Sequence, residues 1–332
     1  MIKTEDAEFH EPDSADPTWA ETNYFGFYSA EANLNCGVYT LFRPNLGVVH
    51  STICLNSGDA LLPWHADYCD LRSHLPIPEP RSLLNYSLAN GLTVRTLEPN
   101  MAWHLTYDDG EGTSIDVTYR ALMPPFDIHD PEMDPMVAAQ AQDGEFAWGT
   151  AYNGHFDQTG HFTGEVVIRG RRVSIDCVST MDHSWGPRAE RGAPNMSWLH
   201  AHFSDRYAVH AIFSFDQSKG GEELILTHGY VLEDGEIYGL RAGVGRTQRD
   251  DHRFARRVEL EVTDKRGNVH HLRGTGLTRF PWQCWPNMVG FNVLARWECG
   301  TRVGYGEIQD FFEVPGLTAL NAGHPAAAAF SG

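Results

Sequence analysis

The densest group of reactive side chains lies in the segment from Ser179 to Arg188, which reads Ser-Thr-Met-Asp-His-Ser-Trp-Gly-Pro-Arg. The residues before it, Val173 to Cys177, alternate between apolar and polar and predict a strand. If that strand continues, His183 and Trp185 share one face while Asp182 takes the opposite face. A histidine beside an indole offers a proton donor or acceptor next to a flat apolar wall. This face therefore predicts acid–base chemistry on a hydrophobic molecule.

We predict that His183 is the general acid or base and that Asp182 sets its pKa or tautomer. On the opposite face, Asp182 could orient a histidine on a neighbouring strand, or His183 itself if a local bulge turns it. Arg188 is the residue we expect to hold a substrate oxygen or carboxylate. A structural role fits the same residues, because a buried Asp–His pair with a packing indole is a common arrangement at a β corner. Both interpretations stay open at this point.

A second cluster lies in the segment Ser197–Phe203, where alternation places Trp198, His200 and His202 on one face. We predict that Trp198 and His200 line the substrate pocket. A His-x-His pair can also ligate zinc, so a metal-dependent hydrolase or lyase that uses His200 and His202 is an alternative. We assign no metal ligand, because the sequence offers no third ligand at a metal-binding spacing.

Strands must position these side chains, because alternation with a period of two is the dominant pattern along the chain. The clearest examples are residues 113–121, 164–169, 172–176, 224–231 and 256–262. The Asp234-Gly235 pair predicts a tight hairpin between two strands. The best helix candidate runs from Asp134 to Gln142, with a proline in its first turn.

Many short strands separated by turn residues predict an all-β fold of the antiparallel sandwich or barrel type. A chain of 332 residues contains more strand than one small barrel needs, so we predict two β units. We place the first unit at residues 1–178 and the second at residues 179–332.

The composition excludes several classes of function. Acidic residues outnumber basic ones by 44 to 25, which gives a net charge of −19 and argues against binding to nucleic acid or to an anionic membrane surface. No apolar run approaches the length of a transmembrane helix. The polar start of the chain does not read as a secretory signal, and the six cysteines include no C-x-x-C. We therefore expect a cytoplasmic protein with reduced thiols.

Familiar cofactor and nucleophile motifs do not occur in the sequence. There is no G-x-G-x-x-G after a strand, no P-loop, no G-x-S-x-G and no H-E-x-x-H. We therefore expect no cofactor.

Four stretches of the chain, Gln158–Gly164, Ile175-Asp176, Met181–Arg188 and Gly304–Glu307, resemble the AttH/carotenoid-hydratase-like group of proteins. The most specific of these strings is Asp-His-x-Trp-Gly. The resemblance implies a fold of two lipocalin-like β-barrel units.

For the carotenoid 1,2-hydratases of that group, the resemblance implies cofactor-free addition of water to an isoprenoid double bond by a His and a Trp. The matching positions in this sequence are His183 and Trp185. The hydratases use a further Tyr and Asp, for which Tyr207 and Asp205 are the candidates by proximity. We accordingly place Tyr207 among the substrate-binding residues.

We predict a cofactor-independent lyase or hydratase that acts on a hydrophobic terpenoid, steroid or aromatic (phenolic) small molecule. Trp185 and Trp198 would wall its pocket, where ring faces stabilise a developing cation. The alternatives are a lipocalin-like carrier of an apolar ligand and the metal-dependent enzyme described above. A homodimer is compatible with the sequence, and neither nucleic acid nor a membrane is an expected partner.

Overall fold

The computed structural model describes residues 1–137, 153–188, 195–217 and 221–322. The chain divides into two compact units. The first comprises Met1–Ser57, Ala66–Asp127 and Thr150–Arg188, and the second comprises Gly58–His65, Ile128–Gly149 and Ala189–Gly332. Strands account for 63% of the structure and helices for 7%, which confirms the prediction of an all-β fold.

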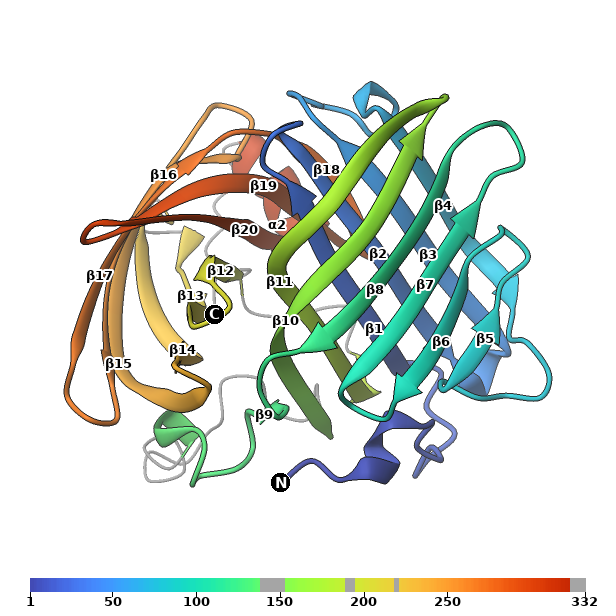
Figure 1. The fold of residues 1–332 in the computed structure, drawn as a ribbon, viewed down its shortest axis with the longest axis horizontal. Helices are drawn as coiled ribbons and strands as arrows, with labels where there is room; N and C mark the ends of the chain where they lie inside the picture. Colours follow the sequence, from blue (N-terminus) through green and yellow to red (C-terminus); the bar gives the residue numbers. More distant parts are fainter. Residues whose placement is uncertain (138–152, 189–194, 218–220, 323–332) are drawn as a thin grey trace. The chain divides into compact units, whose positions relative to one another are not determined.

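The first unit is built on one antiparallel sheet that curls into a half-barrel (Figure 1). Its strands are β1 (Trp19–Ser29), β2 (Leu34–Arg43), β3 (Val48–Asn56), β4 (Tyr68–Pro76), β5 (Asn85–Ser87), β6 (Thr93–Glu98), β7 (Ala102–Asp108), β8 (Ser114–Ala121), β9 (Phe126–Asp127), β10 (Gly154–Ile168) and β11 (Arg171–Pro187). They follow the order β4-β3-β2-β1-β11-β10-β8-β7-β6-β5, with β9 paired to β10 beside this path. Short helices η1 (Thr4–Ala7) and η2 (Pro44–Leu46) complete the unit.

One face of this sheet is concave and filled with aromatic rings. Phe25 on β1 and Trp103 on β7 lie four strand positions apart in the sheet, yet their ring centroids are 6.1 Å apart. Tyr86 on the edge strand β5 packs against Phe42 on β2, seven strand positions away, with centroids 5.1 Å apart. Rings on such distant strands meet only because the sheet curls around them. The concave face therefore forms the core of this unit.

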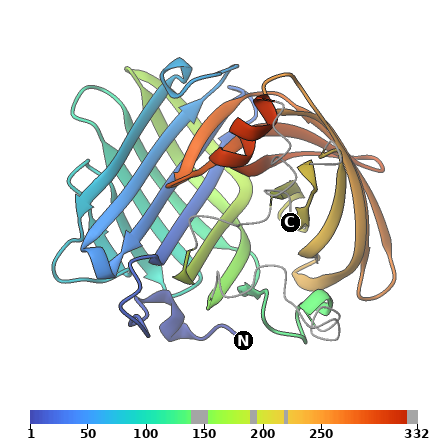
Figure 2. The ribbon, with the colours of Figure 1, turned by 180° about the vertical axis from the view of Figure 1, so that it is seen from behind.

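The second unit is a closed barrel (Figure 2). Its strands are β12 (Met196–Ser204), β13 (Tyr207–Ser214), β14 (Glu223–Glu233), β15 (Glu236–Arg249), β16 (Ala255–Asp264), β17 (Val269–Gly276), β18 (Phe280–Trp285), β19 (Met288–Cys299) and β20 (Arg302–Glu313). They follow the order β17-β16-β15-β14-β13-β12-β20-β19-β18, and a further pairing of β17 with β19 closes eight of them into the barrel. The unit also contains η3 (Pro63–His65) and α2 (Val314–Asn321).

The barrel is filled by side chains that alternate inward along each strand. Leu199 on β12, Ile308 on β20 and Trp297 on β19 are at most 2% exposed and belong to one continuous apolar cluster. Because the intervening residues of these strands point the other way, the polar cluster predicted on β12 lies on the outer face of the barrel wall.

The predicted strands and hairpin correspond to the observed elements. The turn between β14 and β15 consists of Asp234 and Gly235, with φ angles of 55° and 87°, as the Asp-Gly signal indicates. The predicted unit boundary after residue 178 falls inside β11, which continues to Pro187 between β1 and β10. The strand that carries the Asp-His-Ser-Trp motif is thus part of the first unit.

Helix is scarce in the described residues. The predicted helix at 134–142 begins as expected, with a helical turn at residues 135–137 and the Asp134 carboxylate accepting a hydrogen bond from the Met136 backbone N–H. The remainder of that prediction lies outside the described residues. No helix in the described parts of the chain has the length and apolar character needed to cross a membrane.

Candidate active site

His183 lies near the end of β11, on the concave face of the curled sheet. It pairs with Asn23 on β1 and with Phe156 on β10, and its side chain is 3% exposed. Trp185 lies two residues further along and points to the same side, with its ring 5.2 Å from the His183 ring. The alternation predicted from the sequence therefore places these two residues together.

The hydrogen bonds of His183 determine which ring nitrogen carries its proton. Its Nδ1 lies 2.7 Å from the backbone carbonyl oxygen of Thr22, and a carbonyl can only accept, so Nδ1–H is the donor. Its Nε2 is buried and has no hydrogen-bond partner in the described structure. Burial lowers the pKa of His183 to about 3. The ring is therefore neutral, and its free lone pair is on Nε2.

Glu21 faces this lone pair from the neighbouring strand. It lies on β1 opposite Trp185, its side chain is fully buried, and its Oε1 is 3.7 Å from Nε2 of His183. Burial raises the pKa of Glu21 to about 7, although hydrogen bonds and the charge of His10 act in the opposite direction. A carboxyl group with this pKa exchanges a proton readily near neutral pH.

His10 reaches the same point from the N-terminal segment. Its Nδ1 lies 2.6 Å from Oε1 of Glu21, and its Nε2 lies 3.2 Å from Oδ1 of Asp6. Burial by itself would lower the pKa of His10, but the hydrogen bonds and charges of Glu21 and Asp6 raise it. Phe9 holds the segment in place by packing edge-on against Phe42, with centroids 5.0 Å apart.

Trp185 forms a flat wall beside these polar groups. The ring of His10 stacks on the indole at 3.9 Å with an interplanar angle of 8°. The indole lies over Gly154 on β10, where a Cβ atom would come within 2.0 Å of it. A glycine at position 154 is therefore what allows Trp185 to lie flat on the neighbouring strand.

Asp182 and Arg188 lie away from this group. Asp182 points to the opposite face of β11, where burial and then the nearby charge of Asp157 raise its pKa well above the usual range. Arg188 donates a hydrogen bond to Oγ of Ser184 on that same face. Strand alternation continues through the motif without the bulge that would bring Asp182 to His183. The backbone carbonyl of Thr22 occupies the orienting position that we predicted for Asp182.

The second predicted cluster belongs to the barrel. Nε1 of Trp198 donates a 3.1 Å hydrogen bond to Nε2 of His210, and Nδ1 of His210 lies 2.7 Å from Nδ1 of His200. Since Nε2 of His210 accepts, its Nδ1 must carry the proton and donate it to His200. The His200 and His202 rings stack with centroids 6.0 Å apart. Trp198 and His200 thus both contact His210, in a chain of side chains that is buried at its two histidines and partly buried at Trp198.

Tyr207 points to the other side of the barrel wall, into the apolar cluster. Its hydroxyl lies 2.7 Å from Nδ1 of His270, and its ring lies 4.1 Å below the guanidinium carbon of Arg302. It therefore belongs to a different group of residues from Trp198 and His200.

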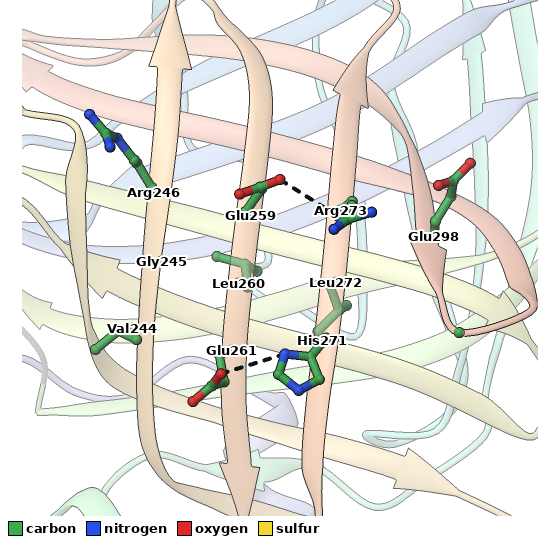
Figure 3. Close-up of a pocket in the computed structure, with 11 residues that line it drawn as sticks. Val244, Gly245, Arg246, Glu259, Leu260, Glu261, His271, Leu272, Arg273 and Glu298 are labelled. Carbon is green, nitrogen blue, oxygen red and sulfur yellow. Dashed lines mark ion pairs between the residues drawn. The ribbon is translucent and has the colours of Figure 1, made fainter.

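The barrel also has an open pocket of about 600 Å³ on its outer surface (Figure 3). Glu259 pairs with Arg273 and Glu261 pairs with His271 across it, with N–O distances of 3.6 and 3.5 Å. The site residues predicted from the sequence do not line it. An open pocket lined by several charged side chains differs from the hydrophobic pocket that we predicted.

Sequence reasoning missed His10 and Glu21. Glu21 carries one available signal, because it is an acidic residue in the otherwise largely apolar and aromatic strand Trp19–Ser29. His10 lies in a polar, acid-rich segment and carries no such signal. In the described part of the chain, His10, Glu21 and His183 form the one set of three side chains whose donor atoms lie close enough together to hold a metal ion.

The comparison with protein families identifies the chain. Residues 3–313 match a family described as a domain of unknown function (DUF7064). The chain belongs to this family. No curated protein matches it in sequence.

Two solved structures share the fold. A candidate AttH protein from Nitrosomonas europaea matches with a TM-score of 0.58 and 10% identity, over 88% of this chain and 91% of that one. Kievitone hydratase from Nectria haematococca matches with a TM-score of 0.51 and 13% identity, over 93% of this chain and 92% of that one. The predicted resemblance to the AttH/hydratase-like group is thus confirmed at the level of the fold.

Proposed function

We propose that this protein is a hydratase that adds water to a carbon–carbon double bond of a hydrophobic molecule, or removes it, by acid–base catalysis. The observation that carries the proposal is the free lone pair on Nε2 of His183, buried 3.7 Å from the carboxyl group of Glu21. A neutral imidazole of this kind accepts a proton from water, and a neighbouring carboxyl group can supply one to carbon.

In each cycle Glu21 gives a proton to the substrate and His183 takes one from water. The π electrons of the double bond take the proton of the Glu21 carboxyl group, which leaves a carbocation on the adjacent carbon. Water adds to that carbon and loses a proton to Nε2 of His183. The imidazolium then returns this proton to the Glu21 carboxylate, whose Oε1 is 3.7 Å away, and both groups regain their starting states.

Trp185 supports the step in which charge develops. The face of an indole attracts a nearby cation, and a site that excludes water strengthens this attraction. Trp185 is only partly buried, and because His10 stacks on one face of its indole while Gly154 lies against the other, a substrate would have to displace the His10 ring to reach an indole face. A flat or unsaturated apolar molecule fits such a wall, which favours a terpenoid, steroid or phenolic substrate.

The fold neighbour supports the type of reaction. Kievitone hydratase is named for a hydration, and it shares the fold of this chain across most of both lengths. The Asp-His-x-Trp-Gly string supplies the His183 and Trp185 of the proposed site.

A panel of apolar alkenes tests the proposal, with kievitone as its first member. The purified chain is incubated with each compound in ¹⁸O-labelled water, and the products are analysed by mass spectrometry. We expect at least one compound to gain one labelled water. Binding of a panel compound without any conversion would contradict the proposal and favour the carrier alternative.

A further inference from the structure

We propose that His10, Glu21 and His183 form a binding site for a divalent transition-metal ion. One donor atom from each side chain lies within 4.8 Å of the other two. The three residues come from the N-terminal segment, β1 and β11, so the fold itself brings them together.

The two histidines have the outer hydrogen bonds that metal-binding histidines need. A ligating histidine usually donates its second ring N–H to a carboxylate or a backbone carbonyl, which fixes the ring and aims the other nitrogen at the metal. Nδ1 of His183 donates to the carbonyl of Thr22 at 2.7 Å and leaves Nε2 facing the site. Nε2 of His10 lies 3.2 Å from the Asp6 carboxylate and leaves Nδ1 facing Glu21.

The donor set matches the chemistry of a divalent ion. Two imidazoles and one carboxylate are the protein ligands of many zinc sites that keep a fourth position for water, and the same set suits iron(II). Bond lengths of about 2.0–2.2 Å place the ligand atoms of a tetrahedral zinc site about 3.3 Å apart. The corresponding separations are 3.7 Å between His183 and Glu21 and 2.6 Å between His10 and Glu21. These two separations are therefore within about 1 Å of this geometry, and the third, between His10 and His183, is at most 4.8 Å.

Metal binding has a structural consequence. The ion would tie the N-terminal segment, through His10, to β1 and β11 of the curled sheet. A ligand that binds only the folded state stabilises that state, so the metal should raise the melting temperature of the protein.

Metal binding also has a consequence for catalysis, and this consequence alone rests on the proposed function. A bound ion takes up the His183 lone pair and the Glu21 carboxylate. The metal-loaded protein should therefore lack the proposed hydratase activity. Binding itself is measured without a substrate, so the two proposals can fail independently.

Isothermal titration of the EDTA-treated full-length chain with ZnCl₂ tests the site, and Co²⁺ absorption reports the ligand geometry. We expect one ion per chain and loss of binding in the His10→Ala and Glu21→Gln variants. His10 is 23% exposed, so its replacement leaves the core intact. Asp6→Asn, which removes only an outer partner, should weaken binding by about 10–100-fold.

His271→Ala is the matched control, because His271 is 70% exposed on the outer surface of the barrel (Figure 3). It should bind Zn²⁺ as the parent chain does. Absence of one-to-one binding, or unchanged affinity in folded His10→Ala and Glu21→Gln variants, would overturn the proposal. So would loss of binding in His202→Ala with full binding in His10→Ala, because the ion would then lie at the barrel histidines.

Discussion

Nε2 of His183 lies 3.7 Å from Oε1 of Glu21, although the two residues are 162 positions apart in the sequence. Both side chains are buried on the concave face of the curled sheet. Burial keeps the imidazole neutral, and it raises the pKa of the carboxyl group to about 7, so that the carboxyl group still holds a proton part of the time near neutral pH. One group can therefore accept a proton while the other supplies one, which is the pairing that acid–base catalysis requires.

Replacing Glu21 by Gln should lower the rate of hydration by about 10²–10⁴-fold, because Gln has nearly the same shape and has no proton to supply to carbon. Initial rates with a converted panel compound measure the effect, and circular dichroism checks the fold. Glu261→Gln, at a carboxylate that is 57% exposed on the barrel, is the control and should retain the parent rate. A Glu21→Gln variant with nearly full activity would remove Glu21 from the mechanism.

Replacing Gly154 by Ala should displace Trp185 from β10, because the new methyl group would lie 2.0 Å from the indole. Overpacking of this kind costs about 1–3 kcal/mol of unfolding free energy, which urea denaturation measures. The rate of hydration should fall as well, since the wall of the site moves. Gly58→Ala is the comparison, because nothing lies within 4 Å of the added methyl group there. Equal stability of the two variants would show that the indole has room to move.

Acid should destabilise the first unit partly through His50. Burial lowers the pKa of His50 to about 4, from 6.5 in an unfolded chain, with smaller contributions from His74 and Arg43. Between these pH values the unfolded state binds more protons than the folded state. The stability that neutral His50 contributes is therefore fully present above pH 6.5 and is lost as the pH falls towards 4.

The size of that loss is at most about 3 kcal/mol, and urea denaturation across this pH range measures it. His50→Gln should flatten the decline, whereas His271→Gln, at an exposed position, should leave it unchanged. Identical pH profiles for the parent chain and His50→Gln would mean that His50 titrates alike in both states.

Local patterns predicted the fold class and one strand of the site. Alternation places His183 and Trp185 on one face because it depends only on neighbouring residues. The same alternation places Asp182 and His183 on opposite faces. We expected a direct contact between them through a bulge, but β11 continues without a bulge to Pro187.

Local sequence patterns did not predict the long-range contacts of the site. Glu21 and His10 meet His183 through the pairing of β1 with β11 and through the path of the N-terminal segment. The spacing of these residues in the sequence does not predict that pairing. A single acidic residue within a largely apolar strand was the one local sign that Glu21 has a special role.

The rate of hydration by His183→Gln is the decisive measurement of whether His183 accepts a proton in the reaction. The measurement uses a compound that the parent chain converts, with its dissociation constant measured in parallel and the fold checked by circular dichroism. We predict a folded protein that binds the compound as before and converts it about 10²–10⁴-fold more slowly. A folded His183→Gln variant that converts it at the parent rate would show that His183 is not the proton acceptor.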